Sequence, residues 1–326
     1  MRKLFLHIGF NKTGSTSLQH SLVENSDTLE EQGVLYPYER TAPFCQTKQH
    51  VPLAAAIPGR NVFWLLPSKQ KTLDDAYSSF WKYIDGKEFN TLIISSESFG
   101  DLDVSDRKIE WIKKQFDGYD ITIVAYIRRQ DSYFLSFYQQ RLRAEKRHKP
   151  FRFEDYSKTK ACYFGQRIAP WRDAFGSENV IVRPCDPKFW PDGELLYDFL
   201  DVIGVKQERI KLIPPLNEGV DYRVAEFIRH INQISRHKDI PRKRIMELTM
   251  TLNRSLDREK MVLSSNQVDI VRKHFAEDNT VALEGTGISL DEFFPPVEAT
   301  QKARLVPDEF LNLMQTRQAR RLKTTE

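Results

Sequence analysis

The chain of 326 residues has no long apolar run and little cysteine. A membrane-spanning helix needs about 20 consecutive apolar residues, and no segment approaches that length. The N-terminal MRKLFLHIGF lacks the long apolar core and the small-residue cleavage site of a secretory signal. Cys45, Cys162 and Cys185 are too few and too widely spaced for a disulfide framework or a zinc site. We therefore expect a soluble protein of a reducing compartment, the cytoplasm, without a membrane span or a bound metal.

The chain also lacks a large excess of charge of either sign. Its 49 basic and 45 acidic residues give a net charge of +4. This excess is compatible with a polyanionic small molecule but too small to predict a nucleic-acid partner. With 40% hydrophobic residues the chain can bury one large core, and no feature of the sequence fixes an oligomeric state.

Apolar segments of strand type alternate with helical patterns along the first two thirds of the chain. The predicted strands are Leu4–Ile8, Val34–Tyr36, Thr91–Ser95, Ile121–Ile127 and Val180–Val182, and the predicted helices lie around 15–25, 73–84, 104–116, 131–147, 165–175 and 193–203. This alternation predicts an α/β fold with a central parallel sheet, covered by helices, with ligands at the carboxyl ends of the strands. Beyond residue 215 only helical patterns remain. We expect a core domain of residues 1–215 and a helical C-terminal subdomain or cap with a polar tail over residues 216–326.

The segment after the first predicted strand has the composition of an anion-binding loop. Gly9 and Gly14 permit positive φ, and the helix that begins near Ser15 offers unpaired N–H groups and a positive dipole end. A Walker A loop carries its lysine after the second glycine, whereas Lys12 stands two residues before Gly14. The loop therefore predicts an anion site that differs from an ordinary ATP site, although a simple capped helix after a strand has the same residue types. The predicted ligands are Lys12, Thr13, Gly14, Ser15, Thr16 and Ser17.

The run K-T-G-S-T-S after an apolar strand resembles the 5′-phosphosulfate loop, K-x-G-[ST]-[ST], of sulfotransferases that use 3′-phosphoadenosine-5′-phosphosulfate (PAPS). These enzymes carry an arginine at the end of a later strand and a serine eight residues on, both directed at the 3′-phosphate. Arg128, at the end of the Ile121–Ile127 strand, and Ser136 match that spacing. The planar guanidinium of arginine also suits a terminal phosphate on chemical grounds. Alone, Arg128 could be a solvated residue at a strand end, but the two motifs in this order favour a phosphate site.

Sulfuryl transfer needs a base within hydrogen-bond reach of the acceptor hydroxyl. Glu97 follows the predicted strand Thr91–Ser95, on the edge of the sheet where the loop is expected. Carbohydrate sulfotransferases commonly use a glutamate after the corresponding strand, so the resemblance implies that Glu97 is the catalytic base. A helix-capping or ion-paired glutamate is the alternative. His50 is the rival base, and it could instead bind substrate or cap the helix that follows it.

The resemblance covers roughly residues 1–200 in motif order, and the chain looks most like the bacterial, carbohydrate-directed branch with H-I-G-x-x-K-T-G-S-T-S-L-Q. It implies a P-loop-type three-layer sandwich and PAPS as cofactor, with 3′,5′-adenosine bisphosphate as product. The acceptor would be a hydroxyl of a glycan or other small alcohol, and Lys12 would assist catalysis without a metal. Ser17 replaces the tryptophan that cytosolic sulfotransferases place after their loop, and their R-K-G element is absent. The residues that stack on adenine and the third 3′-phosphate ligand are therefore unassigned.

Two other functions use the same kind of fold. A P-loop nucleotide or small-molecule kinase is disfavoured because no lysine follows Gly14 and because the Ile121–Ile127 strand has no acidic residue to hold Mg²⁺. A nucleotide-binding protein of this fold without catalytic turnover is the other alternative.

Overall fold

The computed structural model describes residues 1–60, 62, 65–100, 106–144, 147–214, 219–234, 242–257, 259–297 and 304. The chain forms two compact units. The first contains Met1–Arg129, Lys160–Asn217 and Ala276–Phe293, and the second contains Gln130–Thr159, Glu218–Phe275 and Phe294–Glu326. The polar tail expected after about residue 302 lies, apart from Arg304, outside the described residues. A functional boundary near residue 215 stays a prediction.

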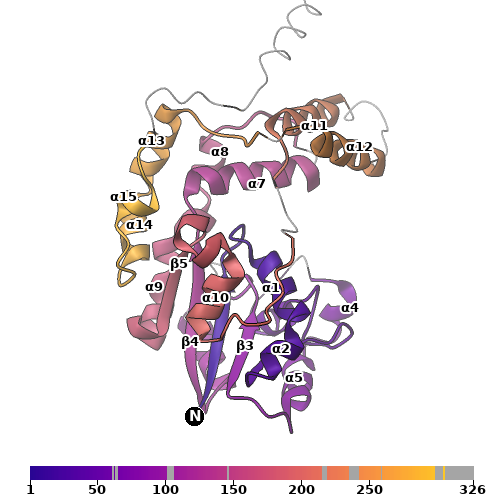
Figure 1. Cartoon of the computed structure of the whole chain (residues 1–326), viewed down its shortest axis with the longest axis vertical. Helices are drawn as coiled ribbons and strands as arrows, with labels where there is room; N and C mark the ends of the chain where they lie inside the picture. The colour runs from indigo at the N-terminus through magenta and orange to yellow at the C-terminus, as the bar shows by residue number, and fades with distance from the viewer. Residues whose placement is uncertain are drawn as a thin grey trace, which may run out of the picture. The chain divides into compact units, whose positions relative to one another are not determined.

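The first unit is built on a five-stranded parallel sheet (Figure 1). Its strands are β1 (Arg2–Gly9), β2 (Val34–Leu35), β3 (Thr91–Ser95), β4 (Tyr119–Ile127) and β5 (Val180–Pro184), in the order β2-β3-β1-β4-β5. In the central strand, Leu4 pairs with Leu92 on one side and with Ile121 on the other. All five predicted strands and the α/β fold with a parallel central sheet are confirmed.

Helices cover both faces of this sheet. In β1, Leu4 to Ile8 are all buried, which is the continuous pattern of a parallel strand packed on two sides. On one face, Leu18 and Leu22 of α1 and Phe199 of α10 share a core cluster with the strands. The helices of the first unit are α1 (Ser15–Glu24), α2 (Ser26–Glu30), α3 (Val51–Ala55), α4 (Pro67–Gln70), α5 (Ala76–Ile84), α6 (Asp106–Gln115), α9 (Phe164–Phe175), α10 (Leu195–Ile203), α14 (Ala276–Leu283) and α15 (Leu290–Phe293).

Two features of the sequence explain where helices of the first unit end or pack. Gly204 adopts φ 72° after α10, so this glycine forms the expected left-handed C-cap.

Helix α14 comes from the C-terminal part of the chain but packs on α9, where Arg172 donates to the carbonyls of Ala282 at 3.0 Å and Glu284 at 2.8 Å. These bonds satisfy carbonyl groups at the end of α14.

The described part of the second unit is helical. It contains α7 (Gln130–Ala144), α8 (Glu154–Ser157), α11 (Tyr222–Ile234), α12 (Arg242–Ser255) and α13 (Ser265–His274). Asn232 of α11 is buried and donates to the carbonyls of Leu142 and Arg147, each at 2.8 Å, which fixes α11 against the end of α7. Among the helices described, none has the length and apolar character needed to cross a membrane.

Candidate functional site

The loop between β1 and α1 is held in a tight, left-handed backbone conformation. Gly9, Lys12 and Gly14 have φ values of 108°, 67° and 87°. The Thr13 hydroxyl donates to the carbonyl of Phe10 at 2.5 Å and closes the loop on itself. The amide of Phe10 donates to the carbonyl of Tyr126 at 3.0 Å, which joins the loop to β4. The predicted anion-binding loop is therefore a defined structure at the carboxyl edge of the sheet.

The first turn of α1 contains no acidic residue, and its N-cap residue makes no capping side-chain hydrogen bond. Gly14 stands at the N-cap and has no side chain to offer the first N–H groups of the helix. A side chain at Gly14 would also lie 2.6 Å from Leu195 Cδ2. Ser15 is buried, while Thr16 and Ser17 are half-buried beside it. This donor set suits a phosphate or sulfate group.

Arg128 directly contacts the loop. It follows β4, and its Nη1 donates to the carbonyl of Lys12 at 2.9 Å, across 116 residues of sequence. Parallel pairing of β1 with β4 explains this contact, because it brings the carboxyl ends of the two strands to the same edge. Ser136 lies half-buried on α7, in the second unit, so its predicted partnership with Arg128 stays a prediction.

Glu97 lies against both ends of the loop. It follows β3 and is 8% exposed, and its carboxylate accepts a hydrogen bond from the hydroxyl of Ser15. A Cβ atom at Gly9 would lie 3.1 to 3.3 Å from Cα, Cβ and Cγ of Glu97. Only glycine at position 9 therefore leaves Glu97 in this place without displacement. The structure brings Glu97, Lys12, Ser15 and Arg128 to one edge of the sheet.

His50 lies in a different environment from Glu97. Its ring is fully buried, and burial lowers the pKa of His50 to about 4. The amide of Ser95 donates to Nδ1 at 3.1 Å, so Nε2 carries the proton and donates to the carbonyl of Pro37 at 2.8 Å. Both ring nitrogens of His50 are therefore engaged by backbone groups, Nδ1 by Ser95 at the end of β3 and Nε2 by Pro37 after β2.

A buried polar layer beneath the loop was not predicted from the sequence. Nδ1 of His7 lies 2.7 Å from the hydroxyl of Ser95, which also accepts a bond from Gln19 Nε2 at 3.0 Å. Burial lowers the pKa of His7 to about 4, so this ring is neutral at physiological pH. The layer connects β1, β3 and α1 directly under the residues of the site.

Arg167 of α9 supports the loop from the opposite side of the sheet edge, and sequence reasoning also missed it. Its Nε and Nη2 donate to the carbonyl of Gly100 at 3.0 and 2.7 Å, and its guanidinium lies 3.8 Å from the ring centroid of Phe10. A side chain at Gly100 would collide with the carbonyl oxygen of Ile8 and with Phe10. The sequence did contain a signal for Arg167. This charged residue stands on the same helix face as the apolar residues Phe164, Ile168 and Trp171, which are buried.

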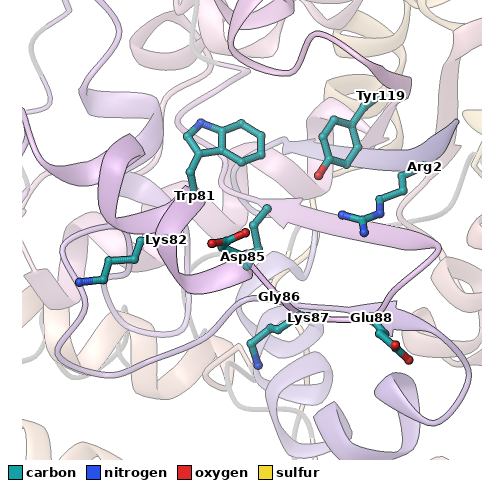
Figure 2. Close-up of a pocket in the computed structure, with 9 residues that line it drawn as sticks. Arg2, Trp81, Lys82, Asp85, Gly86, Lys87, Glu88 and Tyr119 are labelled. Atoms are coloured by element: carbon teal, nitrogen blue, oxygen red, sulfur yellow. The ribbon is translucent and has the colours of Figure 1, made fainter.

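A pocket of about 690 Å³ lies elsewhere on the first unit (Figure 2). It is lined by Arg2 and Tyr119, at the starts of β1 and β4, and by the segment 81–88 before β3. Because the strands are parallel, this pocket lies at the amino edge of the sheet, roughly 25 Å of strand length from the loop. Its position separates it from the candidate site.

No metal-binding group was found among the residues described: no three or more histidine, cysteine, aspartate or glutamate side chains there are placed to hold an ion. Activity without a metal stays a prediction, because it concerns the reaction and not the arrangement of these side chains.

No family model matches the chain. An uncharacterized protein of Archaeoglobus fulgidus is 32% identical over 115 residues, a match that spans 35% of this chain and 30% of that relative. The crystal structure of a sulfotransferase from Alicyclobacillus acidocaldarius is similar over 87% of this chain and 95% of that one, with 14% identity and a TM-score of 0.46. At these levels neither similarity assigns an activity to this chain.

Proposed function

We propose that this chain is a PAPS-dependent sulfotransferase that acts on a hydroxyl of a carbohydrate or other small alcohol. The observation that carries the proposal is the meeting of three segments at one edge of the sheet: the loop around Lys12, the arginine after β4 and the glutamate after β3. Arg128 contacts the carbonyl of Lys12, and Ser15 contacts Glu97. Anion-binding donors and a carboxylate are thus adjacent, as an in-line transfer to a hydroxyl requires.

The donor chemistry of the loop fits the phosphosulfate end of PAPS. Lys12, Ser15, Thr16, Ser17 and the N–H groups at the start of α1 would hold this group, with Thr13 and Gly14 shaping the loop around it. Arg128, together with Ser136, would hold the 3′-phosphate. When bound, PAPS supplies an activated sulfuryl group attached to a phosphate leaving group. The ammonium of Lys12 would stabilise negative charge that develops on the bridging oxygen.

Glu97 is the base in this proposal. Its carboxylate would accept the proton of the acceptor hydroxyl, because it lies beside Ser15 and within the layer of side chains that borders the loop. We assign His50 a structural role, since its nitrogens bond the backbone of Ser95 and Pro37. In that role it would fix the end of β3 and hence the start of the segment that carries Glu97.

Transfer of label from ³⁵S-labelled PAPS to a panel of glycans and small alcohols tests the function. The expected result is a labelled acceptor and release of 3′,5′-adenosine bisphosphate. A thermal-shift series with this bisphosphate and with Mg·ATP should show stabilisation by the bisphosphate. Stabilisation by Mg·ATP alone, with phosphate transfer, would replace the proposal with a kinase, and bisphosphate binding without transfer to any acceptor would favour a non-catalytic binding protein.

A further inference from the structure

We propose that Ser15 is a switch between the cofactor and the base: its hydroxyl holds Glu97 when the loop is empty and turns to the cofactor anion when the loop is filled. This inference rests on the proposed function. It starts from the observation that the hydroxyl of Ser15, the first residue of α1, donates to Glu97, which lies 82 residues away. Both side chains are buried, with exposed fractions of 3% and 8%.

The two roles of Ser15 exclude each other because a hydroxyl carries a single proton. An anion at the start of α1 and the carboxylate of Glu97 would both need that proton, and only one of them can accept it at a time. The carboxylate oxygen of Glu97 that accepts this bond is occupied while Ser15 donates to it, and it becomes available to the acceptor hydroxyl when Ser15 turns away.

The change needs only a side-chain rotation, because the backbone on both sides is fixed. The amide of Ser96 donates to the carbonyl of His7 at 3.0 Å, and the amide of Gly100 donates to the carbonyl of Glu97 at 3.2 Å. Glu97 lies close to Gly9, where a Cβ atom would come within 3.1 Å of its Cα. On the other side, Ser15 begins a regular helix whose first residues are set by Gly14 at the N-cap. Rotation of Ser15 about χ1 moves only its hydroxyl group and needs no change of the backbone.

The switch orders the reaction. With Ser15 donating to the cofactor anion, a carboxylate oxygen of Glu97 takes the proton of the acceptor hydroxyl. The bond between the acceptor oxygen and sulfur forms, and the bond between sulfur and the bridging oxygen breaks, with its electron pair left on the departing bisphosphate. Before cofactor binding, the Ser15 hydroxyl engages a carboxylate oxygen of Glu97, so this oxygen becomes available only in the cofactor complex.

A double-mutant cycle on the affinity for 3′,5′-adenosine bisphosphate tests the switch without measuring activity. In the wild type, binding must break the bond between Ser15 and Glu97, so Glu97→Gln should bind the bisphosphate more tightly. Loss of repulsion between two anions would have the same direction, but it would persist in a Ser15→Ala background. We expect the tightening in the Ser15 background to exceed that in the Ser15→Ala background by about three- to tenfold.

Isothermal titration at fixed pH and salt gives these affinities, with circular dichroism as the check of folding. Ser15→Thr retains the hydroxyl and should retain the coupling, whereas Thr16→Val, which removes a hydroxyl from the same turn, should leave the effect of Glu97→Gln unchanged. Glu97→Ala repeats the cycle with the acceptor group removed. If Glu97→Gln increases the affinity for the bisphosphate equally in the Ser15 and Ser15→Ala backgrounds, the switch is overturned while the proposed function stands. A wild-type protein that does not bind the bisphosphate would overturn the proposed function, and the switch with it.

Discussion

His7 and His50 should make the first unit lose stability as the pH falls from 6.5 toward 4. Both rings are fully buried, and burial lowers the pKa of each from 6.5 to about 4. Below pH 6.5 the unfolded chain takes up two protons that the folded chain does not bind until about pH 4. Above pH 6.5 both histidines are neutral in the folded and the unfolded chain, and the free energy of unfolding has its full value. Below pH 6.5 it falls progressively, by roughly 3 kcal/mol for each histidine in total. A total near 6 kcal/mol is comparable with the whole stability of many domains.

Urea unfolding at a series of pH values, followed by tryptophan fluorescence, measures this effect in the first unit, because all five tryptophans belong to it. Between pH 5 and 6 the free energy of unfolding should fall by up to about 2.7 kcal/mol per pH unit. His50→Gln should halve this slope, even if the substitution also lowers the stability at every pH. The half-buried His20 offers a control, since His20→Gln should retain most of the slope. A wild-type slope below about 1 kcal/mol per pH unit, or an unchanged slope in His50→Gln, would refute the reasoning.

Three further predictions concern the proposed reaction. Glu97→Gln should lower kcat by about 10²- to 10⁴-fold without weakening cofactor binding and should remove the acidic limb of the pH–rate profile, and near-normal turnover would remove Glu97 as the base. Arg128→Ala should weaken 3′,5′-adenosine bisphosphate by roughly 10- to 100-fold at fixed salt, measured by calorimetry, and unchanged affinity in a folded variant would remove the 3′-phosphate assignment. Activity should survive EDTA, because Lys12 and the start of α1 supply the positive charge, whereas an absolute need for Mg²⁺ would favour the kinase.

The regular parts of the fold could be predicted because their signals are local. The apolar, β-branched runs of β1, β3 and β4 predict strands wherever they are placed in space, and Gly204 marks the end of α10 through its own backbone preference. The short helices α2 and α4 were not predicted, because four or five residues hold too little periodicity to identify a helix. The strand order, with β1 at the centre, depends on long-range pairing and was not predicted.

In the candidate site, too, local features could be predicted from the sequence and long-range contacts could not. Residue types predicted the loop around Lys12, and the resemblance to sulfotransferases implied the arginine after β4. Arg128 contacts the carbonyl of Lys12. The bond between Ser15 and Glu97 and the support of the Phe10 segment by Arg167 depend on segments that are 67 or more residues apart in the sequence. Sequence alone also left Glu97 and His50 as rivals, and only the engagement of both ring nitrogens of His50 separates their environments.

The central position of β1 has a consequence for synthesis of the chain. Of the five strands described, β1 is synthesised first, yet its two neighbours, β3 and β4, are complete only at Ser95 and Ile127. At about 5 to 20 residues per second, both edges of this apolar strand stay unpaired for roughly 4 to 17 seconds, and the edge that pairs with β4 stays unpaired for roughly 6 to 24 seconds. An unpaired apolar strand edge is a template for aggregation. The nascent chain should therefore depend on chaperones most strongly before residue 127 has emerged, and destabilising substitutions in β4 should lower the yield of soluble protein more than those in β5.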